Sequence, residues 1–252
     1  MKPTVYLIGG TTEANVAASR LLADGYRVVT SVATGHGRRL AVATETDAGR
    51  KDAAAMAAHA AEARARLLLD CSHPFATGAR HEARRAAELA HIPYLRFCRP
   101  APAAGKDFAG GWEEAVKRLR QRGGRALLTI GVRHLHLFAA AGLDFAVRVL
   151  PLEESLAECR RLQIDPRDII AAHPPHSEDF NRACIRHTRA DILVTKDSGA
   201  AGGLPEKLAA ARKEGIETLV IARPPEREHV SLYDLDELLD RMELILADEP
   251  DR

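Results

Sequence analysis

The chain has 252 residues, of which 46% are hydrophobic, and its 36 Lys and Arg against 35 Asp and Glu give a formal net charge of +1. This length and apolar content suffice for one large domain or two small ones, and the absence of a low-complexity run excludes a disordered chain. The balanced charge and an aromatic content of 4% argue against a nucleic-acid partner. We expect no membrane span, because no stretch approaches about 18 apolar residues without a charge.

The four cysteines, Cys71, Cys98, Cys159 and Cys184, stand singly, without a CxxC pair. A disulfide framework or a zinc knuckle needs closely paired cysteines, so we expect four reduced thiols in a cytoplasmic protein. The opening segment MKPTVYLIGG runs from a short apolar stretch into two glycines, which is typical of a first β-strand rather than of a secretory signal peptide.

Short β-branched runs alternate along the chain with longer stretches rich in Ala, Leu, Arg and Glu. The short runs predict strands at 4–8, 27–32, 67–70, 94–96, 125–130, 145–149, 168–171, 192–195 and 217–221. The longer stretches predict helices at 13–23, 51–64, 77–90, 112–120, 133–140, 153–162, 177–187, 203–214 and 232–246. Strands joined by helical crossovers form parallel sheets covered on both faces, so the predicted fold class is α/β, doubly wound.

A segment rich in Pro and Gly, residues 99–111, interrupts this alternation and is interpreted as a linker. It divides the chain into an N-terminal domain at 1–100 and a C-terminal domain at 101–252. Ligands of open parallel sheets bind beyond the carboxyl ends of the strands, so we expect the site in a cleft between the two halves.

The first predicted strand ends in Gly9-Gly10-Thr11-Thr12 and leads into a helix. Two glycines allow a tight turn, and the free N–H groups of a helix start attract phosphate or carboxylate. The full dinucleotide fingerprint G-x-G-x-x-G is absent, because Thr11 and Ala14 stand where its second and third glycines would be. The turn is therefore either an anion site or a purely structural element.

The second predicted strand lacks the Asp or Glu that contacts the ribose hydroxyls in NAD-binding units, and offers Thr30, Ser31 and Thr34 instead. Arg38 and Arg39 follow shortly after it. Hydroxyl and Arg side chains suit a 2′-phosphate better than a bare ribose, because Arg makes paired hydrogen bonds to phosphate oxygens. A solvated loop with two surface arginines is the alternative.

Ser72 and His73 follow the predicted strand at 67–70, directly before Pro74. A residue before proline is extended, so the imidazole is held at the strand tip, where α/β proteins build their sites. Because histidine changes charge near neutrality, His73 is a candidate proton donor, with a core or capping role as the alternative.

The densest polar group follows the predicted strand at 192–195. A lysine, an aspartate and a serine precede three glycines there, at Lys196, Asp197, Ser198, Gly199, Gly202 and Gly203. Glycine lets the backbone approach a ligand closely, so we predict that this loop contacts a cofactor. The strand at 125–130 ends similarly, in Gly131, and Arg133 opens the next helix.

Two histidine pairs, His134 with His136 and His173 with His176, have a spacing that zinc could use. No HExxH motif accompanies them, so we expect structural or substrate-facing histidines and no metal. No G-x-S-x-G motif surrounds Ser198, so a serine-hydrolase triad is not predicted.

Several motifs occur in a fixed order over nearly the whole chain: GGTTEA, CSHPFA, LRFCRP, LTIGVRHL, RVLP, VTKDSGAAGG-x3-K-x-AA and IARPP. Together they resemble the precorrin-6A reductases and cobalt-precorrin-6A reductases of corrin-ring biosynthesis. The resemblance implies two Rossmann-like domains with mainly parallel sheets and a nicotinamide cofactor in the cleft between them. It also implies reduction of one double bond of precorrin-6A, or of its cobalt form, to give precorrin-6B. NADPH is the expected cofactor, with NADH as the alternative.

The resemblance and the strand-end pattern together suggest a role for each candidate. The expected cofactor contacts are Gly9, Gly10, Thr11, Thr12, Arg38, Arg39, Ser72, Gly131, Lys196, Ser198, Gly199, Gly202 and Gly203. His73 and Asp197 are the catalytic candidates. The acetate and propionate arms of a tetrapyrrole substrate would pair with basic side chains, for which the candidates are Arg133, His176 and Arg223.

Two other functional classes stay open at this stage. One is another NAD(P)-dependent reductase or epimerase on the same fold, and the other is a non-catalytic protein that binds nucleotides or tetrapyrroles. Whether the macrocycle already holds cobalt, which group donates the proton and which oligomer forms are not predicted.

Overall fold

The computed structural model describes residues 2–33, 35–98, 107–224, 231–232 and 234–247. The chain forms two compact units, one made of residues 1–100 and 225–252 and the other of residues 101–224. Of the predicted linker at 99–111, residues 99–106 lie outside the described part of the chain. No helix in that described part is long and apolar enough to cross a membrane.

The first unit contains a six-stranded sheet with the order β3-β2-β1-β4-β5-β12, and every neighbouring pair is parallel. Its strands are β1 (Thr4–Ile8), β2 (Arg27–Val32), β3 (Glu45–Ala48), β4 (Ala65–Asp70), β5 (Tyr94–Phe97) and β12 (Ser231–Leu232). This is the Rossmann strand order, in which the direction of the chain across the sheet reverses between β1 and β4. Such a reversal is where α/β sheets bind ligands.

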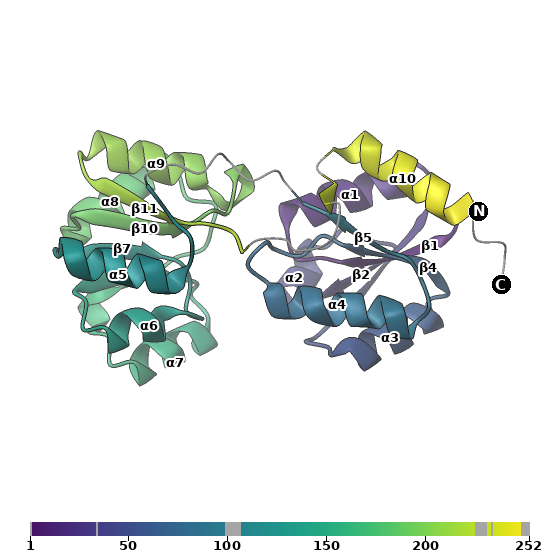
Figure 1. Cartoon of the computed structure of the whole chain (residues 1–252), viewed down its shortest axis with the longest axis horizontal. Helices are drawn as coiled ribbons and strands as arrows, with labels where there is room; N and C mark the ends of the chain where they lie inside the picture. The colour runs from purple at the N-terminus through teal and green to yellow at the C-terminus, as the bar shows by residue number, and fades with distance from the viewer. Residues whose placement is uncertain (1, 34, 99–106, 225–230, 233, 248–252) are drawn as a thin grey trace. The chain divides into compact units, whose positions relative to one another are not determined.

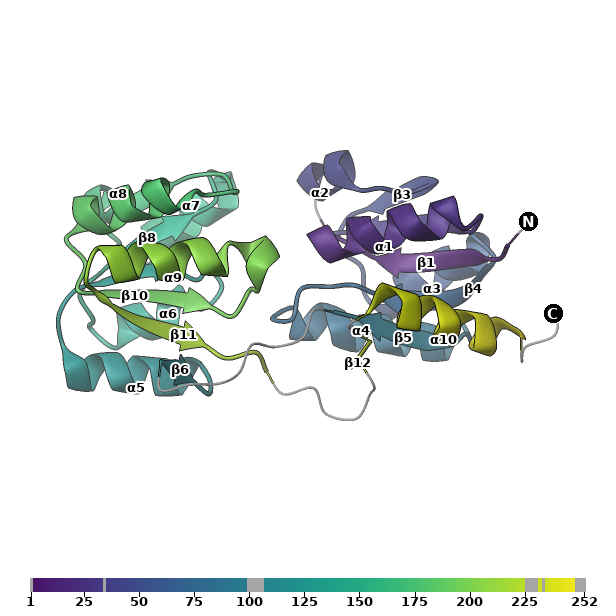
Figure 2. The same cartoon turned by 90° about the horizontal axis from the view of Figure 1, so that it is seen from above.

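Helices cover both faces of this sheet (Figures 1 and 2). They are α1 (Thr12–Ala23), α2 (Gly35–Leu40), α3 (Ala53–Glu62), α4 (Thr77–Leu89) and α10 (Leu235–Ala247). Val5 and Leu7 join the core beneath α1 and α10, whereas Tyr6 and Ile8 join the core beneath α3 and α4. The continuous apolar run of β1 therefore supplies two cores, because successive side chains of a strand point to opposite faces.

The second unit repeats this arrangement, with a parallel sheet in the order β6-β11-β10-β7-β8-β9. Its strands are β6 (Phe108–Ala109), β7 (Ala126–Thr129), β8 (Phe145–Val149), β9 (Ile169–Ala171), β10 (Ile192–Lys196) and β11 (Glu217–Ile221). The chain reverses its direction across the sheet between β7 and β10. The carboxyl ends of β7 and β10 thus form the second expected ligand edge.

The helices of the second unit are α5 (Trp112–Arg122), α6 (Leu135–Ala140), α7 (Glu153–Arg161), α8 (Glu178–Thr188) and α9 (Leu204–Lys213), with 3-10 turns η1 (Pro166–Asp168) and η2 (Ala200–Gly202). Helices α8 and α9 lie side by side on one face of the sheet (Figures 1 and 2). Leu127, Ala146 and Leu193 pack beneath them. Arg148 comes two residues after Ala146 on β8, so the side-chain alternation directs it to the same face.

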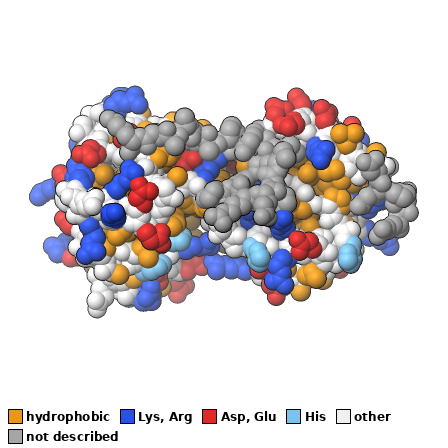
Figure 3. All heavy atoms as spheres, in the orientation of Figure 1, with side chains coloured by type: hydrophobic (Ala, Val, Ile, Leu, Met, Phe, Trp, Pro, Cys, Tyr) orange, Lys and Arg blue, Asp and Glu red, His pale blue; other side chains and the backbone are white. Residues whose placement is uncertain are grey.

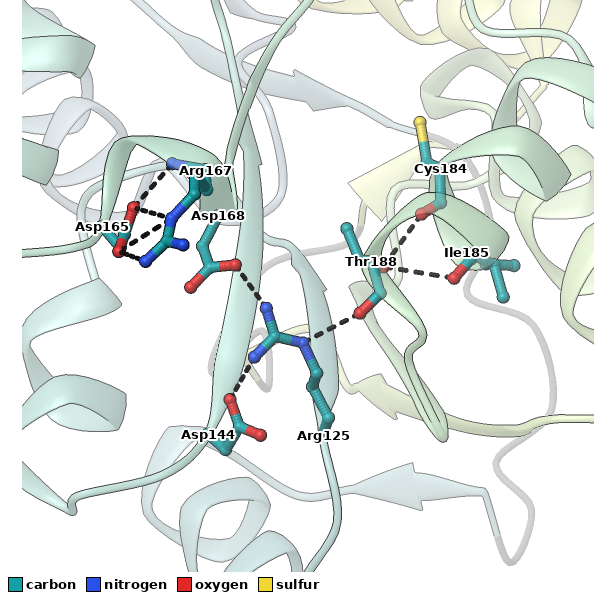
Figure 4. A network of polar contacts seen from close by, with 8 residues as sticks. All are labelled: Arg125, Asp144, Asp165, Arg167, Asp168, Cys184, Ile185 and Thr188. Carbon is teal, nitrogen blue, oxygen red and sulfur yellow. Dashed lines mark hydrogen bonds and ion pairs between the residues drawn. The ribbon is translucent and has the colours of Figure 1, made fainter.

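Arg125 ties together the amino ends of the strands in the second unit (Figure 4). Its guanidinium donates to the carboxylates of Asp144 and Asp168, which directly precede β8 and β9, and to the carbonyl of Thr188 at the end of α8, with an Nε–O distance of 2.8 Å. This network lies at the edge opposite to the carboxyl ends of the strands, so its role is structural.

The predicted α/β class with mainly parallel sheets is confirmed, and all nine predicted strands and nine predicted helices have a counterpart within a few residues. The sequence did not predict α2, β3, β6 or β12. The polar segment ETDA of β3 is partly exposed, and β6 and β12 have two residues each, so none of the three presents an apolar run.

The C-terminal segment differs from its predicted assignment to a domain at 101–252. β12 pairs with β5 of the first unit, and α10 buries Leu238 and Met242 in the core that also contains Leu21. The predicted helix at 232–246 begins later, at Leu235, because the preceding residues form β12. The sixth strand of the first unit therefore comes from the far end of the chain.

Candidate functional site

The two glycines after β1 are required for different structural reasons. A Cβ atom on Gly9 would lie 2.6 Å from Cγ2 of Thr30, so a side chain there would collide with β2. Gly10 has a φ of +95°, which disfavours other residues, and nothing lies within 4 Å of its missing Cβ. Because Gly10 is also exposed, its backbone is accessible to a ligand.

Thr11 connects the glycine turn to the segment that follows β4. Its Oγ1 accepts a hydrogen bond from the Ala14 N–H at 3.0 Å, which caps α1, and donates to the Cys71 carbonyl at 2.9 Å. The neighbouring Thr12 is exposed in the first turn of the helix. The structure therefore places the predicted residues 9–12 next to the segment that carries the predicted Ser72 and His73.

Ser72 belongs to a buried polar network at the end of β4. Its backbone N–H donates to Oδ1 of Asp70 at 2.8 Å, and Oδ2 of Asp70 accepts from the Tyr94 hydroxyl at 2.7 Å and from Nη1 of Arg96 at 2.9 Å. Asp70 is 0% exposed and Ser72 is 5% exposed. Burial and the neighbouring Asp70 carboxylate raise the pKa of Tyr94 well above its usual value. This network fixes the carboxyl end of β4 to the neighbouring β5.

His73, which directly follows Ser72, is half-buried. The Phe75 N–H donates to Nδ1 of His73 at 3.2 Å, so in this arrangement the neutral imidazole carries its proton on Nε2. The His73 and Phe75 ring centroids are 5.8 Å apart. A hydrogen bond of this kind defines which ring nitrogen carries the proton in the neutral form.

Arg38 and Arg39 are both exposed on α2. The end of that helix is fastened to α1, because the Asn15 side chain donates to the Leu40 carbonyl at 2.9 Å. Thr30 and Ser31 are buried instead, and Thr34 lies outside the described residues. The arginines are thus the exposed polar groups among the candidates that follow β2.

In the second unit, Asp197 and Arg223 form an ion pair. Nε of Arg223 lies 2.9 Å from Oδ2 of Asp197, and Asp197 is 2% exposed. The Asp197 N–H also donates to the Ile221 carbonyl at 2.9 Å, which continues the pairing of β10 with β11. The catalytic candidate and one substrate candidate are therefore partners of each other.

The loop at 198–203 is closed by contacts to one carbonyl. The Gly202 carbonyl accepts from the Ser198 hydroxyl at 3.2 Å and from Nζ of Lys207 at 2.9 Å. A Cβ atom on Gly202 would lie 2.1 Å from Cβ of Ser198, so only glycine permits this closure. Gly199 and Gly203 have φ values of +65° and +69°, which also favour glycine.

Two lysines near this loop are held in unfavourable surroundings for a charge. Burial and the nearby Arg133 lower the pKa of Lys196 to about 8. Burial, Arg148 and Lys196 lower the pKa of Lys207 to about 7. Arg133 is exposed and follows Gly131, whose φ is +73°. Arg133 and Lys196 therefore lie near each other, at the carboxyl ends of β7 and β10.

The positive potential extends to β8 and to the segment before α8. Arg148 is 6% exposed, and its Nη1 donates to Oδ1 of Asn181 at 2.7 Å. Burial, followed by Arg148 and Lys207, lowers the pKa of His176 to about 4, so this ring is neutral near pH 7. Its ring stacks on Phe180 with the centroids 5.0 Å apart.

Arg148 and Lys207 are the residues of this region that were not among the sequence candidates. An arginine inside the apolar run FAVRV is the signal that could have singled out Arg148. Neither side chain forms an ion pair with a carboxylate of the residues that the structure describes, and a carboxylate is the usual partner of a buried cation. The second unit therefore concentrates positive charge near the carboxyl ends of β7, β8 and β10.

This concentration is local. On the face drawn in Figure 3, Lys and Arg side chains are intermixed with Asp and Glu over both units. Within the described ranges, no group of three His, Cys, Asp or Glu side chains could hold a metal ion.

Comparisons with known proteins identify relatives along nearly the whole chain. Residues 4–243 match the family described as "Precorrin-6x reductase CbiJ/CobK". The chain is 35% identical over 229 residues to cobalt-precorrin-6A reductase of Salmonella typhimurium, covering 87% of each protein. It is 34% identical over 265 residues to cobalt-precorrin-6A reductase of Methanothermobacter thermautotrophicus, covering 98% of this chain and 86% of the relative. The solved structure of "CobK precorrin-6A reductase" superposes with a TM-score of 0.78 at 24% identity, covering 96% of both chains, which supports the fold.

Proposed function

The chain belongs to the precorrin-6x reductase family, and from this membership we propose that it reduces one double bond of precorrin-6A, or of its cobalt form, in cobalamin biosynthesis. NADPH is the proposed electron donor, and the product is precorrin-6B or its cobalt form. The observation that carries the proposal is the family match over residues 4–243, which includes the loops at the carboxyl ends of both central strand pairs. The four buried free cysteines agree with a cytoplasmic location, which we propose as well.

The residues after β1 and β2 fit a phosphorylated dinucleotide. Gly10 leaves backbone accessible before the N-terminus of α1, and the buried Ala14 allows close packing of helix and strand, as the third glycine of the usual fingerprint does. We assign the pyrophosphate contact to Gly9, Gly10 and the start of α1, with the exposed Thr12. The exposed Arg38 and Arg39 suit a 2′-phosphate, which favours NADPH over NADH.

Bound NADPH supplies the hydride, and the protein supplies orientation and a proton. We assign His73 to the reacting region, where its Nε2–H donates a hydrogen bond. Delivery of a proton from His73 requires the imidazolium, whose Nδ1–H can no longer accept from Phe75. Asp197 holds Arg223 through their ion pair. Its proposed catalytic role is therefore to position that guanidinium.

The second unit offers cations for the carboxylate arms of the macrocycle. Arg133 is exposed beside Lys196, and the largely buried Arg223 is fixed by Asp197. A guanidinium makes bidentate contacts to a carboxylate, so these two arginines are assigned to the arms. His176 is assigned to the same group as a neutral donor or acceptor.

The proposal is tested with the purified full-length chain and a panel of acceptors. We expect NADPH to lose its nicotinamide absorbance with precorrin-6A or cobalt-precorrin-6A, in a ratio of one NADPH to one macrocycle. Oxidation of NADPH by an unrelated carbonyl or enone substrate alone would indicate another reductase. Binding of NADPH without oxidation in the presence of both macrocycles would indicate a non-catalytic binding protein.

The role of His73 is tested separately by His73→Gln under single turnover. Glutamine keeps a hydrogen-bond donor but cannot deliver a proton. We expect the reduction step to slow in this variant. An unchanged rate removes His73 from proton transfer.

A further inference from the structure

Lys207 is a buried residue of the second unit that contacts the loop at 198–203. It lies in the first half of α9, is 8% exposed, and donates from Nζ to the Gly202 carbonyl at 2.9 Å. The Ser198 hydroxyl donates to the same carbonyl at 3.2 Å. The loop that follows β10 therefore takes its shape from two side chains that converge on one backbone oxygen.

The charged and titratable groups around Lys207 come from β8, β10, α9 and the segment before α8. Arg148 on β8 and Lys196 at the end of β10 both act against its positive charge, whereas Glu206 on α9 favours it. His176, in the segment before α8, is itself affected by Lys207 and is held neutral. Within the part of the chain that the structure describes, no carboxylate pairs with the Lys207 ammonium.

The pKa of Lys207 is about 7, so its ammonium and neutral amine forms are both populated near neutral pH. The protonated amine still donates to the Gly202 carbonyl, but burial and two neighbouring cations oppose its charge. An anion that arrived at the adjacent loop would offset this repulsion. Protonation of Lys207 and occupancy of the loop by an anion thus favour each other.

We propose that Lys207 is a positioning residue whose ammonium holds the 198–203 loop in the shape that receives an anionic group of a ligand, so that binding of this group draws one proton from solvent onto Lys207. The inference rests on the proposed function in taking this loop to contact a ligand. The anionic oxygens are those of a phosphate on the dinucleotide or of a carboxylate on the macrocycle. The proton balance is simple, since the neutral amine of the free protein accepts one proton from the buffer and no other bond changes.

The test is titration calorimetry of the full-length chain in two buffers of different ionisation enthalpy, because the difference in heat gives the number of protons taken up. NADP⁺ alone probes the phosphate source, and uroporphyrin, a tetrapyrrole with acetate and propionate arms, probes the carboxylate source. At pH 7.5 we expect uptake of about half a proton per site with at least one of the two ligands. We also expect affinity for that ligand to fall about tenfold between pH 6.5 and pH 9.

Three variants separate positioning from a structural role. Lys207→Arg keeps a donor for Gly202 without a titration near neutrality, so it should bind tightly with no proton uptake and a flat pH profile. Lys207→Met should lose both the uptake and most of the affinity, while unfolding at the same or a higher temperature because a buried charge is gone. Lys213→Met, on the exposed end of the same helix, is the matched control and should behave as the wild type.

Proton uptake that disappears in both Lys207 variants but not in Lys213→Met supports the proposal. The absence of uptake with both ligands, or uptake that persists in Lys207→Met, overturns it. These outcomes are independent of catalysis, because they are measured without a reducible substrate. Failure of precorrin-6A reduction with intact Lys207-dependent uptake would contradict the proposed function and leave this inference standing.

Discussion

Each unit has a buried ion pair at the carboxyl end of its sheet. The carboxylate ends β4 in the first unit and follows β10 in the second, and its arginine partner belongs to the neighbouring strand, β5, or to the segment after β11. In the first unit Asp70 pairs with Arg96 at 2.9 Å, and in the second Asp197 pairs with Arg223 at the same distance. The first pair is 0% and 3% exposed, whereas Arg223 retains 11% exposure. The same kind of ion pair is therefore fully buried in the first unit and partly exposed in the second.

The units differ more strongly in how they balance charge beneath the helices. In the first unit Asp47 pairs with Lys51 at 2.7 Å and accepts from the Tyr6 hydroxyl at 2.9 Å. In the second unit Arg148 and Lys207 occupy the corresponding interior without a described carboxylate partner. In this comparison the described interior of the second unit carries positive charge without a carboxylate partner, whereas the first unit pairs its buried charges internally.

The largest effect on stability is expected when the buried ion pair of Asp70 and Arg96 is broken. Arg96→Met removes the guanidinium that pairs with the buried Asp70 carboxylate, which should destabilise the first unit by about 3–5 kcal/mol. The single tryptophan, Trp112, lies in the second unit, so its fluorescence reports on that unit while circular dichroism reports on both. In urea, circular dichroism should show an earlier transition while the Trp112 midpoint stays in place.

Arg223→Met is the matched variant for that experiment. It should shift the Trp112 midpoint instead. The shift should be smaller, because Arg223 is partly exposed and water can reach the Asp197 carboxylate once the guanidinium is removed. A Trp112 midpoint that moves with Arg96→Met would show that the two units do not unfold separately, and the comparison between the pairs would then fail.

Gly202→Ala tests the loop that distinguishes the second unit. The new Cβ would lie 2.1 Å from Cβ of Ser198, so the loop must open. We expect kcat/KM for macrocycle reduction to fall about 100-fold, since displacements of about 1 Å in a site have effects of that size. Gly78→Ala, where nothing lies within 4 Å of the new atom, should leave kcat/KM unchanged. Equal rates for the two variants would remove the loop from the site.

The pH dependence of stability should differ between the units. The pKa of Lys207 falls from 10.5 to about 7 on folding, so between these values the unfolded chain binds more protons than the folded one. Stability of the second unit should therefore rise with pH, by about 2 kcal/mol between pH 7 and pH 9. Urea titrations followed by Trp112 fluorescence measure this slope, and Lys207→Met should reduce it to the part that the lowered pKa of Lys196 contributes. A slope that is unchanged in the variant would assign the effect to other groups.

Below neutrality the same unit should weaken for a related reason. The pKa of His176 is lowered from 6.5 to about 4, so as the pH falls through this range the unfolded chain takes up a proton that the folded chain does not. His176→Gln should reduce the acid sensitivity of the Trp112 midpoint.

The smallest change is expected at the amino ends of the strands. Arg125→Met removes the donor shared by Asp144, Asp168 and Thr188, and should destabilise the second unit by about 1–2 kcal/mol. Ligand affinity and kcat should stay at wild-type values, because the network lies away from the ligand edge. Arg167→Met, which breaks an exposed pair with Asp165, is the control and should leave the midpoint unchanged. A fall in kcat with Arg125→Met would contradict the division between the two edges.

The elements that could be predicted from the sequence are those whose own residues specify them. The run VYLI of β1 is apolar throughout because the strand is buried on both faces, and it was predicted with the observed bounds. β6 and β12 have two residues each and exist through pairing with β11 and β5, so no local pattern reveals them. For the same reason the sequence could not assign α10 to the first unit.

The candidate site divides in the same way. Glycine turns and polar strand ends could be recognised locally, and Gly10, His73 and the 198–203 loop do lie at carboxyl ends of strands. The pairing of Asp197 with Arg223, and the proximity of Arg148 to Lys207 across 59 positions of sequence, depend on the packing of whole strands and helices. Ser72 was predicted as a cofactor contact, but only the fold reveals its burial behind the strand tip.

The most direct test of the account is isotope transfer in a single turnover. NADPH carrying one deuterium at each position of C4 is mixed with an excess of the full-length enzyme and precorrin-6A, or cobalt-precorrin-6A, in ordinary water. The account predicts a macrocycle that gains one deuterium from the cofactor and one hydrogen from solvent, with one NADP⁺ formed per product. A macrocycle of unchanged mass with both forms, while NADPH remains reduced, would contradict it.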